Sequence, residues 1–244
     1  MAKWLVLCSE EEDSWVRRVL KGRPVVGWIN KVSQVGDLHS EKIVIAAFSD
    51  PDLQVQALRT IADHRGWDGP VAALLAGGSA TLMAAKSGLG GRLVGFSPYP
   101  NAEDPPALEL YQGETSGIEA INTLREAFEG FGIRVFICRD QAGGILPRVL
   151  ASMVNEAARV AYEGIAPVEK IDKMMRLGAN FPMGPFEWAD KMGLDTVLNL
   201  LERMHAELGE KYRPHPWIRR KVESGKLGIK SGEGFYKYNS GGRP

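Results

Sequence analysis

Residues 135–154 read VFICRDQAGGILPRVLASMV, and the hydrophobic pattern of the chain changes inside this stretch. Before Arg139, short apolar runs alternate with longer amphipathic stretches, which is typical of strands and helices that follow one another. From Ile145 onward, apolar residues recur at helical spacing, and no further strand pattern appears. We therefore expect an α/β domain over residues 1–139 and an all-helical domain over residues 140–244.

The first of these domains is predicted to hold a mainly parallel β-sheet. Strands are expected over residues 4–8, 25–29, 42–48, 71–75, 93–96, 107–111 and 135–138. Helices are expected between them, over residues 15–20, 53–62, 81–85 and 118–131. Alternation of this kind is typical of βαβ units, in which successive strands run parallel.

The second domain is predicted to be a helical bundle. Apolar residues at helical spacing form a wide stripe from Ile145 to Val160, so a helix is expected up to about Glu163. Further helices are expected over residues 168–177, 186–192, 195–208 and 216–224.

Composition excludes several classes of partner. The chain has 244 residues, of which 44% are hydrophobic, and 30 basic residues balance 30 acidic ones. No overall charge therefore favours nucleic acid or an anionic membrane, and no apolar run approaches the roughly 18 residues of a membrane span. Cys8 and Cys138 are too few for a disulfide scaffold or a zinc knuckle, so a cytoplasmic location is expected. The N-terminus is interpreted as a first strand and not as a signal peptide.

The turn after the first strand argues against a site for a dinucleotide. Residues 8–15 read CSEEEDSW, with no glycine and with four consecutive acids. A pyrophosphate requires a glycine-rich turn that lets the backbone approach it at a helix N-terminus, and four carboxylates would repel it. Acids at this place suit a helix dipole. Asn30, after the second strand, also lacks the carboxylate that would hold an adenine ribose.

A series of motifs in the C-terminal half resembles the 3-hydroxyacyl-CoA dehydrogenase family. The motifs occur in order, and they comprise DQAGGILPR at 140–148, NEA at 155–157, EGIA at 163–166, ID at 171–172, PMGPF at 182–186, Asp190, GLD at 193–195 and GIKSGEGFY at 228–236. Earlier in the chain, RLVGFSPYP at 92–100 and ALEL at 107–110 resemble two further family segments. The resemblance implies a Rossmann-like domain, shortened here, a helical dimerisation domain and oxidation of 3-hydroxyacyl-CoA with NAD.

The resemblance also assigns catalytic positions, and this chain departs from the family at two of them. The family uses a His as the base, oriented by a Glu; the His position is Ser97, and the Glu position keeps its acid at Glu109. A serine hydroxyl does not accept a proton at neutral pH without a neighbouring base. The family Asn, which helps to hold the substrate oxygen, corresponds to Pro147, which has no side-chain amide and no backbone donor.

Other positions are assigned to ligands in the same way. The substrate-contacting Ser of the family falls in the segment 77–81, with Ser79 as the best candidate, and the cofactor-contacting Lys is retained as Lys230. The acid and the lysine that contact the cofactor after the third strand fall at Ser49 and Gln54. The four histidines are interpreted as surface residues: His39, His64, His205 and His215.

Several features keep a structural interpretation beside a functional one. Glu109, without its His, is as compatible with a salt bridge or a solvent-facing position as with a role in the site. Asp172 and Asp190 are expected to be caps or helix–helix contacts, and residues 182–186 a turn that starts a helix. The basic residues of 219–230 are expected to form a solvated helix end, with contact to CoA phosphates as the alternative.

Three hypotheses about function follow. In the first, the chain is a diverged homologue with weak or no dehydrogenase activity that keeps the fold, a homodimer and an acyl-CoA cleft, as a binding, regulatory or partner subunit. In the second, it is a working NAD-dependent 3-hydroxyacyl-CoA dehydrogenase of fatty-acid metabolism whose base is Glu109 or a displaced histidine. In the third, it is an assembly module without a ligand.

Overall fold

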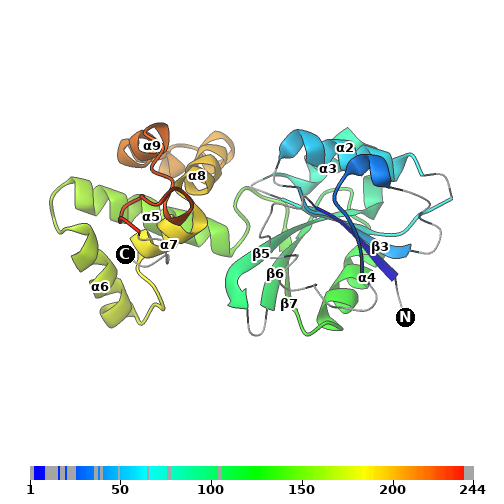
Figure 1. The fold of residues 1–244 in the computed structure, drawn as a ribbon, viewed down its shortest axis with the longest axis horizontal. Helices are drawn as coiled ribbons and strands as arrows, with labels where there is room; N and C mark the ends of the chain where they lie inside the picture. The colour runs from blue at the N-terminus through cyan, green and yellow to red at the C-terminus, as the bar shows by residue number, and fades with distance from the viewer. Residues whose placement is uncertain are drawn as a thin grey trace. The chain divides into compact units, whose positions relative to one another are not determined.

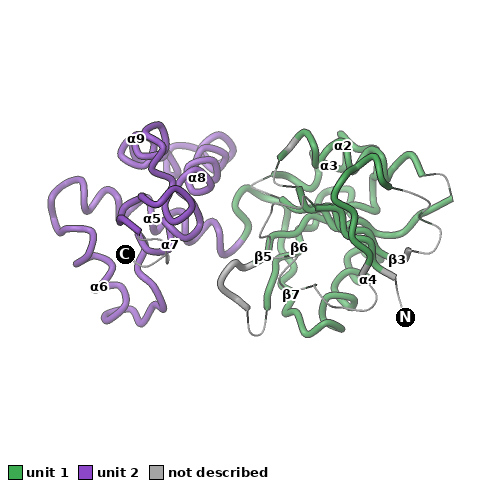
Figure 2. The backbone as a smooth tube through the Cα atoms, in the orientation of Figure 1, with its two compact units in different colours: residues 1–144 green, residues 145–244 purple. Residues whose placement is uncertain are grey.

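The computed structural model describes residues 3–8, 16, 20, 26–35, 38, 41–48, 50–64, 66–75, 78–103 and 106–238. The chain divides into two compact units, unit 1 (Met1–Gly144) and unit 2 (Ile145–Pro244), as Figure 2 shows. The predicted domain boundary between residues 139 and 140 stays a prediction.

Unit 1 is built on a seven-stranded sheet with the strand order β2-β1-β3-β4-β5-β6-β7 (Figure 1). Neighbouring strands run parallel except β5 and β6, which are antiparallel. The mainly parallel sheet predicted from the sequence is therefore confirmed. The strands are β1 Lys3–Leu7, β2 Val26–Ile29, β3 Glu41–Ala46, β4 Val71–Leu74, β5 Leu93–Glu103, β6 Pro106–Gln112 and β7 Arg134–Arg139.

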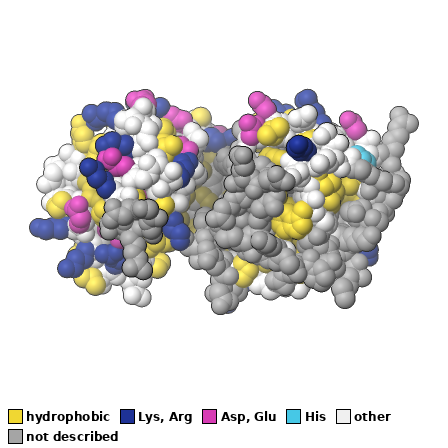
Figure 3. Space-filling model, in the orientation of Figure 1, with side chains coloured by type: hydrophobic (Ala, Val, Ile, Leu, Met, Phe, Trp, Pro, Cys, Tyr) yellow, Lys and Arg dark blue, Asp and Glu magenta, His cyan; other side chains and the backbone are white. Residues whose placement is uncertain are grey.

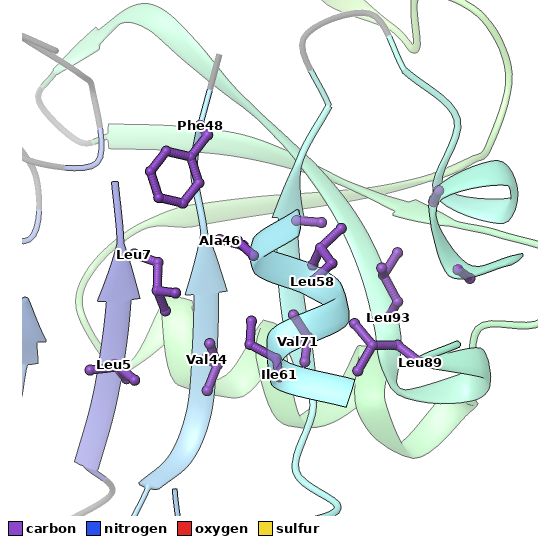
Figure 4. Packing of buried hydrophobic residues seen from close by; sticks show 14 of the residues in the cluster. Leu5, Leu7, Val44, Ala46, Phe48, Leu58, Ile61, Val71, Leu89 and Leu93 are labelled. Atoms are coloured by element: carbon purple, nitrogen blue, oxygen red, sulfur yellow. The ribbon is translucent and has the colours of Figure 1, made fainter. Parts of the chain in front are cut away.

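Helices cover both faces of the sheet, which gives unit 1 two hydrophobic clusters. Leu58 and Ile61 of α2 pack with Leu7, Val44 and Val71 of the strands in one cluster (Figure 4). On the other face, apolar residues of α4 pack against β1, β3 and β5. The described helices are α2 Pro51–Ala62, α3 Ala80–Ser87 and α4 Ile118–Glu129, with 3-10 turns η1 Val32–Gln34 and η2 Gly90–Arg92. A sheet covered on both faces explains why the central strands are continuously apolar.

Strand β5 is longer than the sequence predicts. The expected strand ends at Phe96, and two prolines follow it, Pro98 and Pro100, which lack the N–H that a strand ladder uses. In the structure β5 continues to Glu103, with Pro98 opposite Leu108 of β6. Ser97, which directly follows Phe96, belongs to this extension. It is paired with Glu109 of β6, and this pairing matters for the site.

The described residues of unit 2 form five helices, which lie where the sequence predicts them. Three of them have a proline in the first turn, where a missing N–H costs nothing: Pro147, Pro185 and Pro216. Figure 3 shows Lys and Arg side chains interspersed with hydrophobic ones on the face of unit 2 in view. The elements are α5 Leu146–Tyr162, α6 Val168–Ala179, α7 Pro185–Met192, α8 Leu194–Leu208, η3 Glu210–Tyr212, α9 Pro216–Glu223 and η4 Ile229–Ser231. Within the described part of the chain, no helix has the length and apolar character to cross a bilayer.

Candidate functional site

The structure brings Ser97 and Glu109 together on unit 1. The two residues are directly paired across the antiparallel strands β5 and β6. Directly opposite residues place their side chains on the same face of a sheet, and so does the residue two positions along a strand. Glu109 and Tyr111 therefore share that face with Ser97, and the parallel register adds Cys138 of β7, which is paired with Tyr111.

Glu109 is a fully buried carboxylate with a tyrosine hydroxyl bonded to it. Its exposed fraction is 0%, and the Tyr111 hydroxyl donates to Oε2 over 2.7 Å. Burial and the neighbouring carboxylate of Glu109 both raise the pKa of Tyr111, so this phenol stays protonated and acts as a donor.

Gly144 and Cys138 lie next to the Glu109–Tyr111 pair. A Cβ at Gly144 would overlap the Tyr111 hydroxyl and the Glu109 carboxylate, and the backbone there has φ +56°, so glycine is required. The Cys138 thiol lies 3.9 Å from Glu109 Oε2. Burial and the nearby Glu109 raise the pKa of Cys138 to about 12, so the thiol stays protonated.

Ser79, the predicted substrate contact, is the N-cap of α3. Its hydroxyl donates to Asp140 Oδ2 over 2.7 Å and accepts from the backbone N–H of Leu82. Asp140 follows β7, and its carboxylate also accepts the backbone N–H groups of Ala80 and Thr81 at 2.9 and 2.8 Å. The Asp140 carboxylate therefore binds backbone N–H groups in the first turn of α3.

The predicted cofactor contacts of unit 1 are only partly described. The acidic turn at residues 9–13 and Ser49 lie outside the described residues. Gln54 is 1% exposed, and its amide bridges two strands: it donates to Ala46 O and Leu74 O and accepts from Phe48 N. With its amide engaged in this way, Gln54 does not fit a cofactor contact.

In unit 2, Pro147 and Lys230 lie in ordinary structural surroundings. Pro147 stands in the first turn of α5, where it starts the helix. Lys230 donates to Asp195 Oδ2 over 2.6 Å, and both side chains are partly exposed. The Lys230 ammonium has two further N–H groups, so this residue fits an additional ligand contact.

Asp172 and Asp190 are the buried carboxylates of unit 2. Asp172 accepts the backbone N–H groups of Phe186 and Glu187 at the start of α7, as well as the Tyr236 hydroxyl. This arrangement agrees with the expected role as a cap. Burial raises the pKa of Asp172, while these hydrogen bonds act in the opposite direction.

Asp190 fixes the C-terminal segment to α7. Its carboxylate accepts the backbone N–H groups of Phe235 and Tyr236 and the Tyr238 hydroxyl, at 2.8 to 3.0 Å. A Cβ at Gly234 would overlap this carboxylate, which explains the glycine in that segment. Burial raises the pKa of Asp190 as well.

The three described histidines have partners in their own neighbourhoods. His64 Nδ1 lies 2.8 Å from Thr60 O at the end of α2. His205 pairs with Glu210, and His215 Nδ1 accepts the Trp217 N–H at the start of α9. His39 lies outside the described residues.

Two residues that shape the site were not predicted from the sequence, namely Tyr111 and Asp140. Tyr111 stands two positions after Glu109 in a predicted strand, so strand alternation placed the two on one face. Asp140 directly follows the last strand, as capping acids often do near the carboxyl edge of a sheet. Strand alternation did not show that Tyr111 bonds to Glu109, and Ser79, the partner of Asp140, lies 61 residues away along the chain.

Comparison with known proteins identifies the class to which this fold belongs. The crystal structure of (S)-3-hydroxybutyryl-CoA dehydrogenase from Ralstonia eutropha superposes with a TM-score of 0.83 at 24% identity, covering 98% of this chain and 100% of that one. The likeness shows the fold: a Rossmann-type domain followed by a helical domain.

The sequence comparisons show which proteins the chain resembles. The model of the 3-hydroxyacyl-CoA dehydrogenase C-terminal domain matches residues 143–238. A probable 3-hydroxybutyryl-CoA dehydrogenase of Deinococcus radiodurans is 41% identical over 162 residues, which are 65% of this chain and 57% of that protein. One of Bacillus subtilis is 43% identical over 132 residues, which are 54% and 46% of the two chains. Residues 143–238 therefore match the C-terminal domain of the 3-hydroxyacyl-CoA dehydrogenase family, and the chain spans about half the length of these two relatives.

Proposed function

We propose that this chain is a diverged member of the 3-hydroxyacyl-CoA dehydrogenase family that binds acyl-CoA and has weak or no dehydrogenase activity. One observation supports this proposal above the others. Ser97 stands opposite Glu109, and the carboxylate oxygen that would orient a base accepts a tyrosine hydroxyl instead.

The chemistry explains why this observation matters. Oxidation of an alcohol requires a group that takes the hydroxyl proton while hydride leaves the carbon, and a positioned base contributes about 10²–10⁴-fold to the rate. Ser97 does not serve as that base by itself. Glu109 is an unsuitable replacement, because it is fully buried and Tyr111 is bonded to it.

The coenzyme that the family resemblance implies is NAD, and we propose that it binds weakly. When bound, it would accept the hydride from the substrate carbon. Lys230 would contribute a contact to it, whereas Gln54 is engaged within the sheet. The acids at residues 10–13 further disfavour a pyrophosphate.

An active NAD-dependent 3-hydroxybutyryl-CoA dehydrogenase with a rearranged site is the second candidate. The names of the relatives favour it, since those of Deinococcus radiodurans and Bacillus subtilis are both called probable 3-hydroxybutyryl-CoA dehydrogenases. In this case the proton acceptor would be a group other than Ser97.

We also propose that unit 2 forms a homodimer. Large apolar side chains of α6 and its flanks are exposed, among them Ile165 at 69%, Met174 at 68% and Leu177 at 74%. A second copy would bury these side chains from water. Leu177→Lys is then expected to shift the protein from dimer to monomer in light scattering. The cytoplasmic location expected from the two cysteines stays a prediction.

Thermal shift tests the ligand proposal. A ligand that binds the native state raises the melting temperature by mass action. We expect acetoacetyl-CoA to raise the melting temperature and NADH at the same concentration to leave it nearly unchanged. A clear shift with NADH would favour the active enzyme, and no shift with either ligand would favour an assembly module.

A further inference from the structure

A buried amide of α5 fixes the segment that leads from η3 into α9. Asn155 is 5% exposed, and its Oδ1 accepts the backbone N–H of His215 over 2.7 Å. Its Nδ2 donates to Arg213 O over 3.0 Å. Both ends of the amide therefore bond to this segment and fix the backbone of His215 at the start of α9.

His215 is the N-cap of α9, and its imidazole caps the helix only in the neutral form. Its Nδ1 accepts the backbone N–H of Trp217 over 3.3 Å. Because a backbone N–H only donates, Nδ1 offers a lone pair, and the proton of the neutral ring is on Nε2. Protonation adds a proton to Nδ1, which removes the acceptor of the cap and places one donor opposite another.

The surroundings of the His215 ring disfavour the protonated form. Burial lowers the pKa of His215, as do Arg159 of α5 and Arg220 of α9, whereas Glu163 of α5 acts in the opposite direction. The ring centroid of Tyr162 lies 5.1 Å from that of His215, and the positive end of the α9 dipole adds to the repulsion. Further ion pairs lie on the elements around α9, namely Arg219–Glu202, Arg213–Glu210 and His205–Glu210.

The first turns of α9 bring two apolar side chains into the core of unit 2. Ile218 is fully buried. The ring of Trp217 lies 5.0 Å from that of Phe235 and 6.3 Å from that of Phe186 in α7, measured between centroids. Opening the start of α9 therefore loosens the packing of α7 and the C-terminal segment on one another.

We propose that His215 is an acid-sensitive cap, which holds α9 closed at neutral pH and releases it locally as the pH falls from about 6.5 toward 5. The open form takes up its proton near pH 6.5, whereas the capped form does so only at lower pH. The closed form consequently loses stability relative to the open one as the pH falls through this range. This inference is independent of the proposed function.

Hydrogen exchange of the full chain, followed by mass spectrometry at pH 7.0 and pH 5.0, tests the proposal. Exchange rates are corrected for the pH dependence of an unstructured peptide. We expect the protection of the amides in residues 218–224 to fall by about five- to tenfold, since a lost N-cap and a cation at a helix N-terminus both weaken the helix. Residues 197–204 of α8 are the internal reference and should change by less than about twofold.

Three variants show whether the titration of His215 is the cause. Asparagine caps a helix without titrating in this range, so in His215→Asn the protection of residues 218–224 should change by less than about twofold between the two pH values. Arg220→Gln removes one of the cations and should reduce the loss of protection. His64→Asn is the matched control at a histidine of unit 1, and α9 should respond in it as in the wild type.

The outcomes decide between a titrating cap and an ordinary helix start. A loss over residues 218–224 in the wild type and in His64→Asn that is absent in His215→Asn supports the proposal. Unchanged protection in the wild type, or an equal loss in His215→Asn, overturns it. An equal loss over residues 197–204 also overturns it, because the opening would then not be confined to α9.

Discussion

Both units of this protein bury carboxylates, but they use them differently. Asp172 and Asp190 in unit 2 accept hydrogen bonds from backbone N–H groups and from tyrosines of the C-terminal segment. Glu109 in unit 1 accepts the Tyr111 hydroxyl and lies opposite half-buried Ser97 in the neighbouring strand. Asp172 and Asp190 fix segments of the backbone to one another, whereas the hydrogen bond of Glu109 comes from a side-chain hydroxyl, beside the position that the family resemblance assigns to the base.

The largest effect is expected at Asp190. Asp190→Ala removes the acceptor of two backbone N–H groups and of the Tyr238 hydroxyl. The free energy of unfolding should fall by about 3–5 kcal/mol, because each buried donor without a partner costs about 1–3 kcal/mol. Urea denaturation measures the change. Glu223→Ala, at an exposed acid, should stay within about 0.5 kcal/mol of wild type, and an equally small effect at Asp190 would show that the segment is held by other contacts.

Gly144 tests how tightly the Glu109–Tyr111 pair is enclosed. Gly144→Ala places a methyl group on both polar side chains and should lower the free energy of unfolding by about 2–4 kcal/mol. Gly90→Ala is a matched control, because Gly90 has nearly the same φ, +54°, and open space around it. Its cost should be about 1–2 kcal/mol, from backbone conformation alone. Equal decreases in the free energy of unfolding of the two variants would mean that unit 1 accommodates a methyl group beside Glu109.

Cys138 reports the charge of Glu109 directly. The carboxylate contributes to the raised pKa of the thiol, so Glu109→Gln should lower that pKa and speed alkylation by iodoacetamide at pH 8.5 by roughly tenfold. Mass spectrometry of the modified peptide gives the rate. Cys8, which is fully buried, is the internal reference and should not respond. Unchanged alkylation of Cys138 would contradict the electrostatic coupling.

The smallest expected effect is the pH dependence of the free energy of unfolding that arises from Asp172 in unit 2. Burial raises the pKa of Asp172 above its ordinary value of 3.8, so the folded state takes up a proton at higher pH than the unfolded chain does. This contribution to stability is present at low pH and is lost as pH rises through the raised pKa. Relative to Asp172→Asn, the wild type should therefore gain stability as pH falls from 7 toward 4.5, by about 1.4 kcal/mol or less for each unit of pKa difference. Urea titrations at each pH measure this difference. A loss of stability of the wild type relative to Asp172→Asn as the pH falls would contradict the prediction.

The sequence predicts the elements of this fold well, because their periodicity is strong. The buried run at Ile43–Ala46 and the helical stripe of α5 are examples in which local pattern and tertiary burial agree. The exception is β5, whose two prolines conceal the strand that β6 completes by antiparallel pairing.

The site is less predictable than the fold, because several of its contacts join residues that lie far apart in the sequence. The sequence related Glu109 to Ser97 only through a family resemblance, which assigns them to the Glu and His positions of the family. It did not indicate that Tyr111 would bond to Glu109, that Asp140 would bond to Ser79, or that Gly144 would pack against the buried pair. Apart from the Tyr111–Glu109 bond, which lies within β6, these contacts join segments separated by up to 61 residues, and a local sequence pattern does not show which distant segments meet.

Catalytic turnover tests the central claim most directly. Wild-type protein is mixed with saturating acetoacetyl-CoA and NADH, and absorbance of the reduced nicotinamide is followed over time. Typical enzymes have kcat values of about 1–10³ s⁻¹. Without a proton-transferring group at position 97, we expect a value below about 10⁻² s⁻¹. A kcat of about 1 s⁻¹ or more would contradict the account and identify the chain as a working dehydrogenase.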